Sequence, residues 1–289
     1  MNLLIFGLGY SASHFVRIHG GLFDWTAGTF RGAEPNAGVC PLPQVEKLSF
    51  DGLAPSHAVE AAIQKATHIL VSAPPDETGD AVLRHFGAAL AGAGKLEWIG
   101  YLSTVGVYGD AGGAWIDETA PLRPTSERNA MRVGVEEDWL ALSRESGKAV
   151  QFFRLAGIYG PHRNALVNLK RGTARRLVKP GQVFNRIHVE DIAGAVFSGL
   201  SRPNVGPFIN ITDNEPAPPQ DVIAYAADLL GVEPPPQIAF DEAELTPMAR
   251  SFYGENKRVS NRLMREGLGH EPIYPTYREG IKACFEVGL

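Results

Sequence analysis

The chain opens with a glycine-rich turn whose residue types suit phosphate binding. The apolar run Leu3 to Phe6 leads into a Gly-x-Gly-x-x-Ala pattern formed by Gly7, Gly9 and Ala12. Gly7 permits a sharp turn, Gly9 lets backbone approach a phosphate, and Ala12 allows a helix to pack closely on its strand. N–H groups and the dipole at the helix start then favour a dinucleotide pyrophosphate. An ordinary strand-to-helix turn has the same local pattern. The neighbouring strands and helices must therefore show whether this turn belongs to a dinucleotide-binding fold.

Those elements alternate between strands and helices. The almost continuous apolar run from His68 to Ala73 is typical of a parallel strand covered on both faces. Short loops join the elements, so the sequence predicts an α/β fold with a doubly wound parallel sheet of the Rossmann type. The predicted strands cover residues 3–6, 24–31, 48–51, 68–73, 98–102 and 152–161, with helices at 11–19, 58–66, 80–94 and from 124 through 139.

Several polar residues lie at the predicted carboxyl ends of these strands, where α/β sheets bind ligands. The second strand ends with Thr29 and Arg31, whereas NAD-preferring folds carry an acid there for the ribose hydroxyls. The guanidinium instead indicates a 2′-phosphate, which predicts NADP in preference to NAD. Arg31 is equally compatible with an ordinary surface arginine. The residues at strand ends are Gly7, Arg31, Asp51, Ser72 and Ser103.

Composition narrows the class of protein. The net charge of −5 over 289 residues comes with no long run of Lys or Arg, so neither nucleic acid nor a membrane surface is an expected partner. Cys40 and Cys284 stand far apart, which favours ordinary thiols in a reducing compartment. The first apolar run lacks a basic segment and is interrupted by Gly7, unlike a signal peptide or membrane span. We therefore expect a cytoplasmic protein, and the scattered histidines predict no metal site.

Together, the segments from residue 3 to about residue 213 resemble the extended short-chain dehydrogenase/reductase superfamily of the NAD-dependent epimerase/dehydratase type. The resemblance rests on the glycine turn, Ser103-Thr104-Val105-Gly106-Val107-Tyr108-Gly109, the helix through Glu136, and the segments 152–161, 186–193 and 208–213. It implies that Thr104 hydrogen-bonds the substrate oxygen, with Ser103 as a second candidate. A hydroxyl that merely caps a strand end is the alternative.

The chain departs from this family at its catalytic helix. The family's Tyr-x-x-x-Lys becomes Arg128-x-x-x-Arg132, counted back from Glu136. Spacing by four places these three residues on one helix face. Arg132 can keep the cationic role at the nicotinamide ribose, and Arg128 can bind an anionic group, but arginine cannot act as the acid/base. Alternatively, both arginines are surface charges paired with Glu136.

Hydride transfer would therefore need another proton donor. Tyr108 is the first candidate and Tyr159 the second, although a packed role for Tyr108 is favoured. We interpret His188, Arg154 and Asn210 as scaffold. The catalytic candidates are Thr104, Ser103, Tyr108, Arg128 and Arg132, and the predicted cofactor contacts are Gly7, Gly9, Tyr10, Ser11, Ala12, Arg31, Asp51, Ser72, Ala73, Pro74 and Arg132.

The composition becomes rich in proline after about residue 214. We assign residues 1–160 and 186–214 to the Rossmann domain, and residues 161–185 and 215–289 to a smaller substrate lobe of the kind that the resemblance implies.

Two hypotheses for function follow. The first is an NAD(P)-dependent oxidoreductase or epimerase acting on a small polar substrate, with a sugar or nucleotide sugar implied by the resemblance alone. The second is a non-catalytic NAD(P)-binding redox sensor or regulatory protein, which explains the missing tyrosine directly. A monomer and a homodimer are both compatible with the sequence.

Overall fold

A computed structural model describes residues 1–32, 42 and 44–288 and divides them into two compact units. Unit 1 is Met1–Thr104, Arg128–Arg154 and Ile192–Ile209, and unit 2 is Val105–Glu127, Leu155–Asp191 and Asn210–Leu289. The segment 105–127, assigned from sequence to the Rossmann domain, thus groups with unit 2. The assignment of a substrate lobe stays a prediction. Of the two cysteines, Cys284 is a free buried thiol and Cys40 lies outside the described residues.

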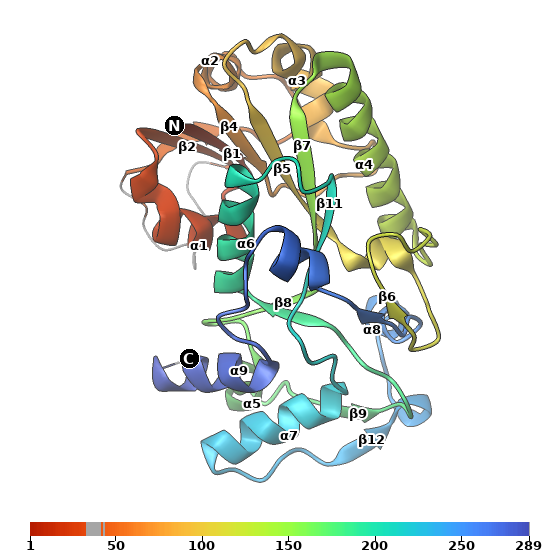
Figure 1. Ribbon diagram of the computed structural model, residues 1–289. Coiled ribbons are helices and arrows are strands. Elements are labelled where there is room, and N and C mark those ends of the chain that lie inside the picture. The colour runs from red at the N-terminus through yellow and green to blue at the C-terminus, as the bar shows by residue number, and fades with distance from the viewer. Residues whose placement is uncertain (33–41, 43, 289) are drawn as a thin grey trace. The chain divides into compact units, whose positions relative to one another are not determined.

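Unit 1 is built on a seven-stranded sheet (Figure 1). Its strands lie in the order β11-β7-β5-β4-β1-β2-β3. Strand β1 pairs in parallel with β2 and β4, and the pairs β2–β3 and β4–β5 are also parallel. The predicted α/β fold is therefore confirmed. The strands of the sheet are β1 (Asn2–Phe6), β2 (Trp25–Phe30), β3 (Glu46–Ser49), β4 (His68–Val71), β5 (Trp98–Thr104), β7 (Ala149–Leu155) and β11 (Phe208–Ile211).

The chain changes direction across the sheet at β1. It runs from β1 outward to β2 and β3, returns to β4 on the other side of β1, and continues to β5. Strands β1 and β4 therefore flank the topological switch point. In open α/β sheets, the crevice that binds ligands lies beyond the carboxyl ends of the strands at this point.

Helices cover the sheet because its strands are apolar on both faces. Leu4 and Phe6 belong to the core cluster that includes side chains of α2, α3 and α4, whereas Leu3 and Ile5 alternate with them and face the other side. On that side α1 and α6 lie together. The His19 ring stacks on the Phe197 ring, with 4.5 Å between the ring centroids. The helices are α1 (Tyr10–His19), α2 (His57–Lys65), α3 (Ala81–Gly92), α4 (Glu127–Ser146) and α6 (Val189–Ser201), and a 3₁₀ turn, η1 (Gly20–Leu22), follows α1.

Unit 2 combines three short parallel ribbons, β10–β8, β12–β9 and β13–β6, with a helical core. Helices α5, α7 and α9 bury Leu166, Val222 and Ile281 against one another. Its elements are η2 (Val105–Tyr108), β6 (Trp115–Ile116), β8 (Gly157–Tyr159), α5 (Ala165–Lys170), β9 (Arg176–Val178), β10 (Arg186–His188), α7 (Pro219–Leu230), β12 (Gln237–Ala239), η3 (Phe240–Glu242), α8 (Pro247–Phe252), β13 (Arg258–Val259), η4 (Leu263–Gly267) and α9 (Tyr277–Glu286).

Over the described ranges, no helix combines the length and apolarity needed to cross a membrane. The same ranges hold no group of three or more His, Cys, Asp or Glu side chains placed to bind a metal ion.

Candidate functional site

Gly7 makes the turn that joins β1 to α1 at the switch point. Its φ is +87°, and a Cβ there would lie 2.7 Å from the backbone nitrogen of Ala73. The Gly7 N–H donates to Oγ1 of Thr29 at 2.9 Å. The N–H groups of Ser72 and Ala73 both donate to the Phe6 carbonyl, at 2.8 and 2.9 Å. The ends of β1, β2 and β4 therefore meet at this turn, which requires glycine at position 7.

Gly9 leaves open space above the start of α1. It is the N-cap residue, no side chain caps the helix, and a Cβ at Gly9 would meet no heavy atom within 4 Å. The first turn of α1 carries no acidic residue of its own that would compete with an anion at the positive end of the helix dipole. Ser11 and Ala12 are buried, while the half-buried Tyr10 packs on His14. This cradle fits a dinucleotide pyrophosphate held by backbone groups.

Arg31 and Asp51 follow the adjacent strands β2 and β3 and are both exposed. The Asp51 carboxylate accepts a hydrogen bond from the Leu53 N–H at 2.9 Å, which closes a local turn. On the other side of the glycine turn, Ser72 and Ala73 are half-buried and Pro74 is exposed. The predicted cofactor contacts at strand ends thus lie along one edge of the sheet.

Ser103 is held by a buried ion pair between α4 and β7. Its hydroxyl donates to Oε1 of Glu136 at 2.5 Å. Glu136 also accepts from Arg154, through Nε at 3.2 Å and Nη2 at 2.6 Å. Each of the three side chains is at most 4% exposed. The scaffold thus engages the Ser103 hydroxyl, while the neighbouring Thr104 lies half-buried at the end of β5.

Arg128 and Arg132 lie one helical turn apart at the start of α4. Arg132 is half-buried, and its Nη1 donates to the Leu102 carbonyl of β5 at 3.4 Å. Burial, followed by the nearby Arg128 charge, lowers the pKa of Arg132, although Tyr101 and Glu136 oppose that shift. Arg128 is exposed. Glu136 forms its buried ion pair with Arg154, and its charge also acts on Arg132, so pairing of the two arginines with Glu136 stays an alternative.

Both tyrosines considered as proton donors are packed. Tyr108 is 3% exposed and its hydroxyl donates to Oδ1 of Asn210 at 2.7 Å. The Tyr159 hydroxyl donates to the Thr276 carbonyl at 3.4 Å, and a Cβ on Gly280 would lie 2.1 Å from it. Burial raises the pKa of Tyr159. These contacts favour a packed role for Tyr108 over that of a proton donor.

His188 is also part of the scaffold of unit 2. His188 is buried, its Nδ1 accepts from the Glu190 N–H at 3.3 Å, and its Nε2 lies 3.8 Å from Sγ of Cys284. Burial lowers the pKa of His188, which disfavours its charged form.

Sequence reasoning missed two positioning contacts. Thr29 was noted only because it is not an acid, although a polar residue inside a buried strand signals a hydrogen-bonded role. Glu136 served only as the reference position from which Arg132 and Arg128 were counted back. Its partners, Ser103 and Arg154, lie on two strands that only the folded sheet brings together.

The chain is similar to several known proteins. No family model matches the chain. The solved structure of a conserved protein of unknown function from Silicibacter pomeroyi is 45% identical, covers 99% of this chain and 98% of that chain, and has a TM-score of 0.87. The chain belongs to the same family as that protein. A second relative is protein YeeZ of Escherichia coli K12. It is 34% identical over 185 residues, or 60% of this chain. The match spans 63% of YeeZ, which is less than two thirds of its length.

Solved structures of lower identity share the family's fold. UDP-glucose 4-epimerase of Thermus thermophilus, solved with NAD, is 19% identical, covers all of both chains and has a TM-score of 0.75. Other neighbours are dTDP-glucose 4,6-dehydratases solved with NAD. The family therefore has the Rossmann-like fold of NAD-dependent epimerase and dehydratase proteins, as the resemblance implied. The replacement of Tyr-x-x-x-Lys by Arg128-x-x-x-Arg132 stays a prediction.

Proposed function

We propose that the chain is an NAD(P)-dependent oxidoreductase with epimerase- or dehydratase-like chemistry, acting on a small polar substrate such as a sugar or nucleotide sugar. The observation that supports the proposal is the cradle at the switch point. There a Cβ on Gly7 would clash with the Ala73 backbone, and open space lies over Gly9. When bound, the nicotinamide supplies or accepts the hydride. The substrate class is supported by the fold neighbours, which include an epimerase and dehydratases of nucleotide sugars.

In this proposal the residues around the cradle bind and orient. The Thr104 hydroxyl orients the reacting oxygen, while Glu136 keeps Ser103 out of that role. Arg132 uses one N–H on the Leu102 carbonyl and has four further donors for a ribose. The exposed Arg128 binds an anionic group of the substrate.

NADP is the preferred cofactor in this proposal. Arg31 is exposed directly after β2, whereas the nearby Thr29 hydroxyl accepts the Gly7 N–H and serves the turn. No carboxylate occupies residues 29–31 to repel a 2′-phosphate, so a guanidinium there favours the phosphorylated ribose. NAD is the alternative.

A second function is favoured by one specific contact. The Tyr108 hydroxyl is committed to Asn210, and arginine cannot replace a tyrosine as acid/base. A non-catalytic NAD(P)-binding sensor or regulatory protein needs no proton donor. It would use the same cradle for the dinucleotide.

One set of measurements separates the two functions. NADPH and NADH are titrated by nicotinamide fluorescence, and carbonyl compounds and nucleotide sugars are then screened for change at the nicotinamide. We expect saturable NADPH binding and turnover that Thr104→Val abolishes, with the exposed Thr173→Val as the matched control. Tight NADPH binding without turnover of any substrate would instead support the sensor. Absence of saturable binding of either dinucleotide would reject both functions.

A further inference from the structure

A short ribbon in unit 2 presents an exposed tryptophan beside polar groups. Strands β6 and β13 pair in parallel, with Trp115 opposite Arg258, and the Ser260 N–H donates to the Ile116 carbonyl at 2.8 Å. In extended chain, residues two apart point to the same side. This geometry places Trp115 and Asp117 on one side of the ribbon.

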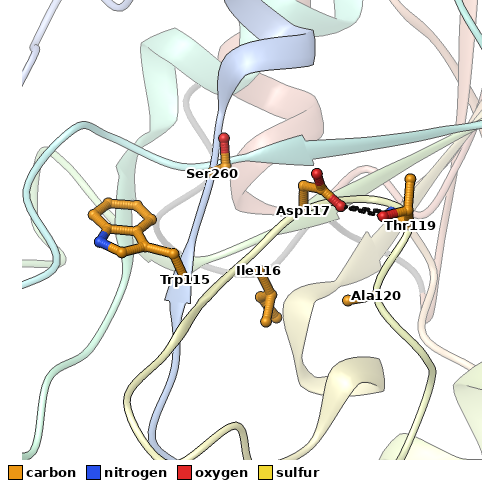
Figure 2. Close-up of a pocket in the computed structure, with 6 residues that line it drawn as sticks. All are labelled: Trp115, Ile116, Asp117, Thr119, Ala120 and Ser260. Atoms are coloured by element: carbon orange, nitrogen blue, oxygen red, sulfur yellow. Dashed lines mark hydrogen bonds between the residues drawn. The ribbon is translucent and has the colours of Figure 1, made fainter.

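These residues border an open pocket of about 330 Å³. In Figure 2, Trp115 stands at one side and Asp117 with Thr119 at the other. Trp115 is 61% exposed. The pocket is lined by Trp115, Ile116, Asp117, Thr119, Ala120 and Ser260.

The polar side of the pocket has a fixed carboxylate. Oδ1 of Asp117 accepts from the Thr119 N–H at 2.9 Å and from the Thr119 hydroxyl at 2.6 Å. The Thr119 hydroxyl bond, then the backbone bond, lowers the pKa of Asp117, and the Arg262 charge adds to this shift. The carboxylate is therefore ionised at neutral pH, with Arg262 partly compensating its charge. The Ser260 Oγ accepts from the Arg262 N–H at 3.3 Å, so its O–H can donate to a ligand, and Oδ2 of Asp117 can accept from one.

We propose that this pocket binds the ring of a neutral sugar. The C–H face of a sugar ring packs on an indole, and hydroxyl groups at its edge donate charge-assisted hydrogen bonds to a fixed carboxylate such as Asp117. The pocket volume of about 330 Å³ falls near the lower end of the range, ~300–1,000 Å³, that small-molecule sites occupy. The carboxylate disfavours a phosphate.

The inference is independent of the proposed enzyme function. None of the six lining residues belongs to the dinucleotide cradle, and the binding test needs neither cofactor nor turnover. A free sugar and the sugar of a larger conjugate share the required chemistry, so the test includes both.

The full chain is examined by ligand-observed saturation-transfer NMR with D-glucose, D-galactose, methyl β-D-glucoside, UDP-glucose and uridine. In parallel, acrylamide quenching reports on Trp115, because Trp98 and Trp139 are buried and the half-buried Trp25 is bonded to Glu46. We expect saturable sugar signals and protection of Trp115 at millimolar sugar. Trp115→Ala lowers the sugar signals, with any signal from the proposed active site remaining, and Asp117→Asn weakens binding at the pocket about tenfold or more. Trp25→Phe is the matched control and keeps the NMR signals.

Three results would overturn the proposal. The first is that no sugar protects Trp115 from acrylamide. The second is that the sugar signals are unchanged in Trp115→Ala. The third is a uridine signal as strong as that of the sugars, which would assign the indole to a nucleobase. NADPH titration of the parent chain separates the two proposals. Saturable NADPH binding together with absent sugar binding would reject the sugar pocket alone.

Discussion

The Ser103 hydroxyl lies 2.5 Å from the carboxylate of Glu136, which also holds the Arg154 guanidinium. This buried contact joins β5 and β7 to α4, the helix that carries Arg128 and Arg132.

The Glu136 contact predicts a large loss of stability. Glu136→Ala leaves Arg154 buried without a counter-charge, so we expect the free energy of unfolding to fall by about 3–5 kcal/mol. Urea denaturation measures it. The adjacent Glu137 is exposed, and Glu137→Ala should stay within about 0.5 kcal/mol of the parent chain. Equal stabilities for the two variants would contradict the role given to Glu136.

The open space over Gly9 predicts a variant that folds but does not bind. A Cβ at Gly9 meets no atom within 4 Å, and its φ of −95° suits any residue. Gly9→Val should therefore keep its thermal unfolding midpoint close to that of the parent and weaken NADPH binding about tenfold or more, because the side chain fills the phosphate position. Gly21→Val, also in open space, is the matched control. Unchanged NADPH affinity in Gly9→Val would misplace the pyrophosphate.

Arg31 predicts a difference between the two dinucleotides. Arg31→Ala should weaken NADPH by about tenfold and leave NADH almost unchanged, since only NADPH carries the 2′-phosphate. Paired fluorescence titrations at one ionic strength measure both affinities. Arg144→Ala removes an exposed charge from the far end of α4 and controls for non-specific attraction. Equal losses for NADPH and NADH in Arg31→Ala would remove the reason for preferring NADP.

Asp213 predicts a stability that falls as pH rises. The residue is 1% exposed, and its Oδ2 has no hydrogen-bond partner among the described residues. Burial raises the pKa of Asp213 to about 8, against a hydrogen bond from the Glu215 N–H that lowers it. An unfolded aspartate titrates near pH ~4, so between about pH 4 and 8 the folded chain binds the extra proton. The Asp213 contribution to stability is therefore complete below that window and lost as pH rises through it.

The test of Asp213 is a comparison of pH profiles. Asp213→Asn imitates the protonated carboxyl, so its unfolding free energy should decline less between pH ~4 and ~8 than that of the parent chain. The exposed Asp228→Asn on α7 should keep the parental slope. Parallel profiles for Asp213→Asn and the parent would show that Asp213 ionises normally.

Local patterns were sufficient to predict the parallel sheet and its covering helices, but not the division into two units or the paired ribbons of unit 2. The apolar run before Gly7 and the one beginning at His68 indicated buried parallel strands, because both faces of such strands are covered and every side chain can be apolar. The strand-turn-helix pattern likewise predicted the placement of Gly7 and Gly9. The sharp turn at Gly7 and the backbone approach to a phosphate at Gly9 both depend on the conformation of a few neighbouring residues.

The partners of polar side chains were decided by tertiary structure alone. Ser103 looked like a second catalytic hydroxyl until the sheet placed it against Glu136, and Tyr108 was open to two roles until it met Asn210. Trp115 and Ser260 border one pocket only because β6 pairs with β13. Periodicity constrains which face a side chain takes within its own element. Which side chain it meets depends on the packing of distant segments, and no local pattern encodes that.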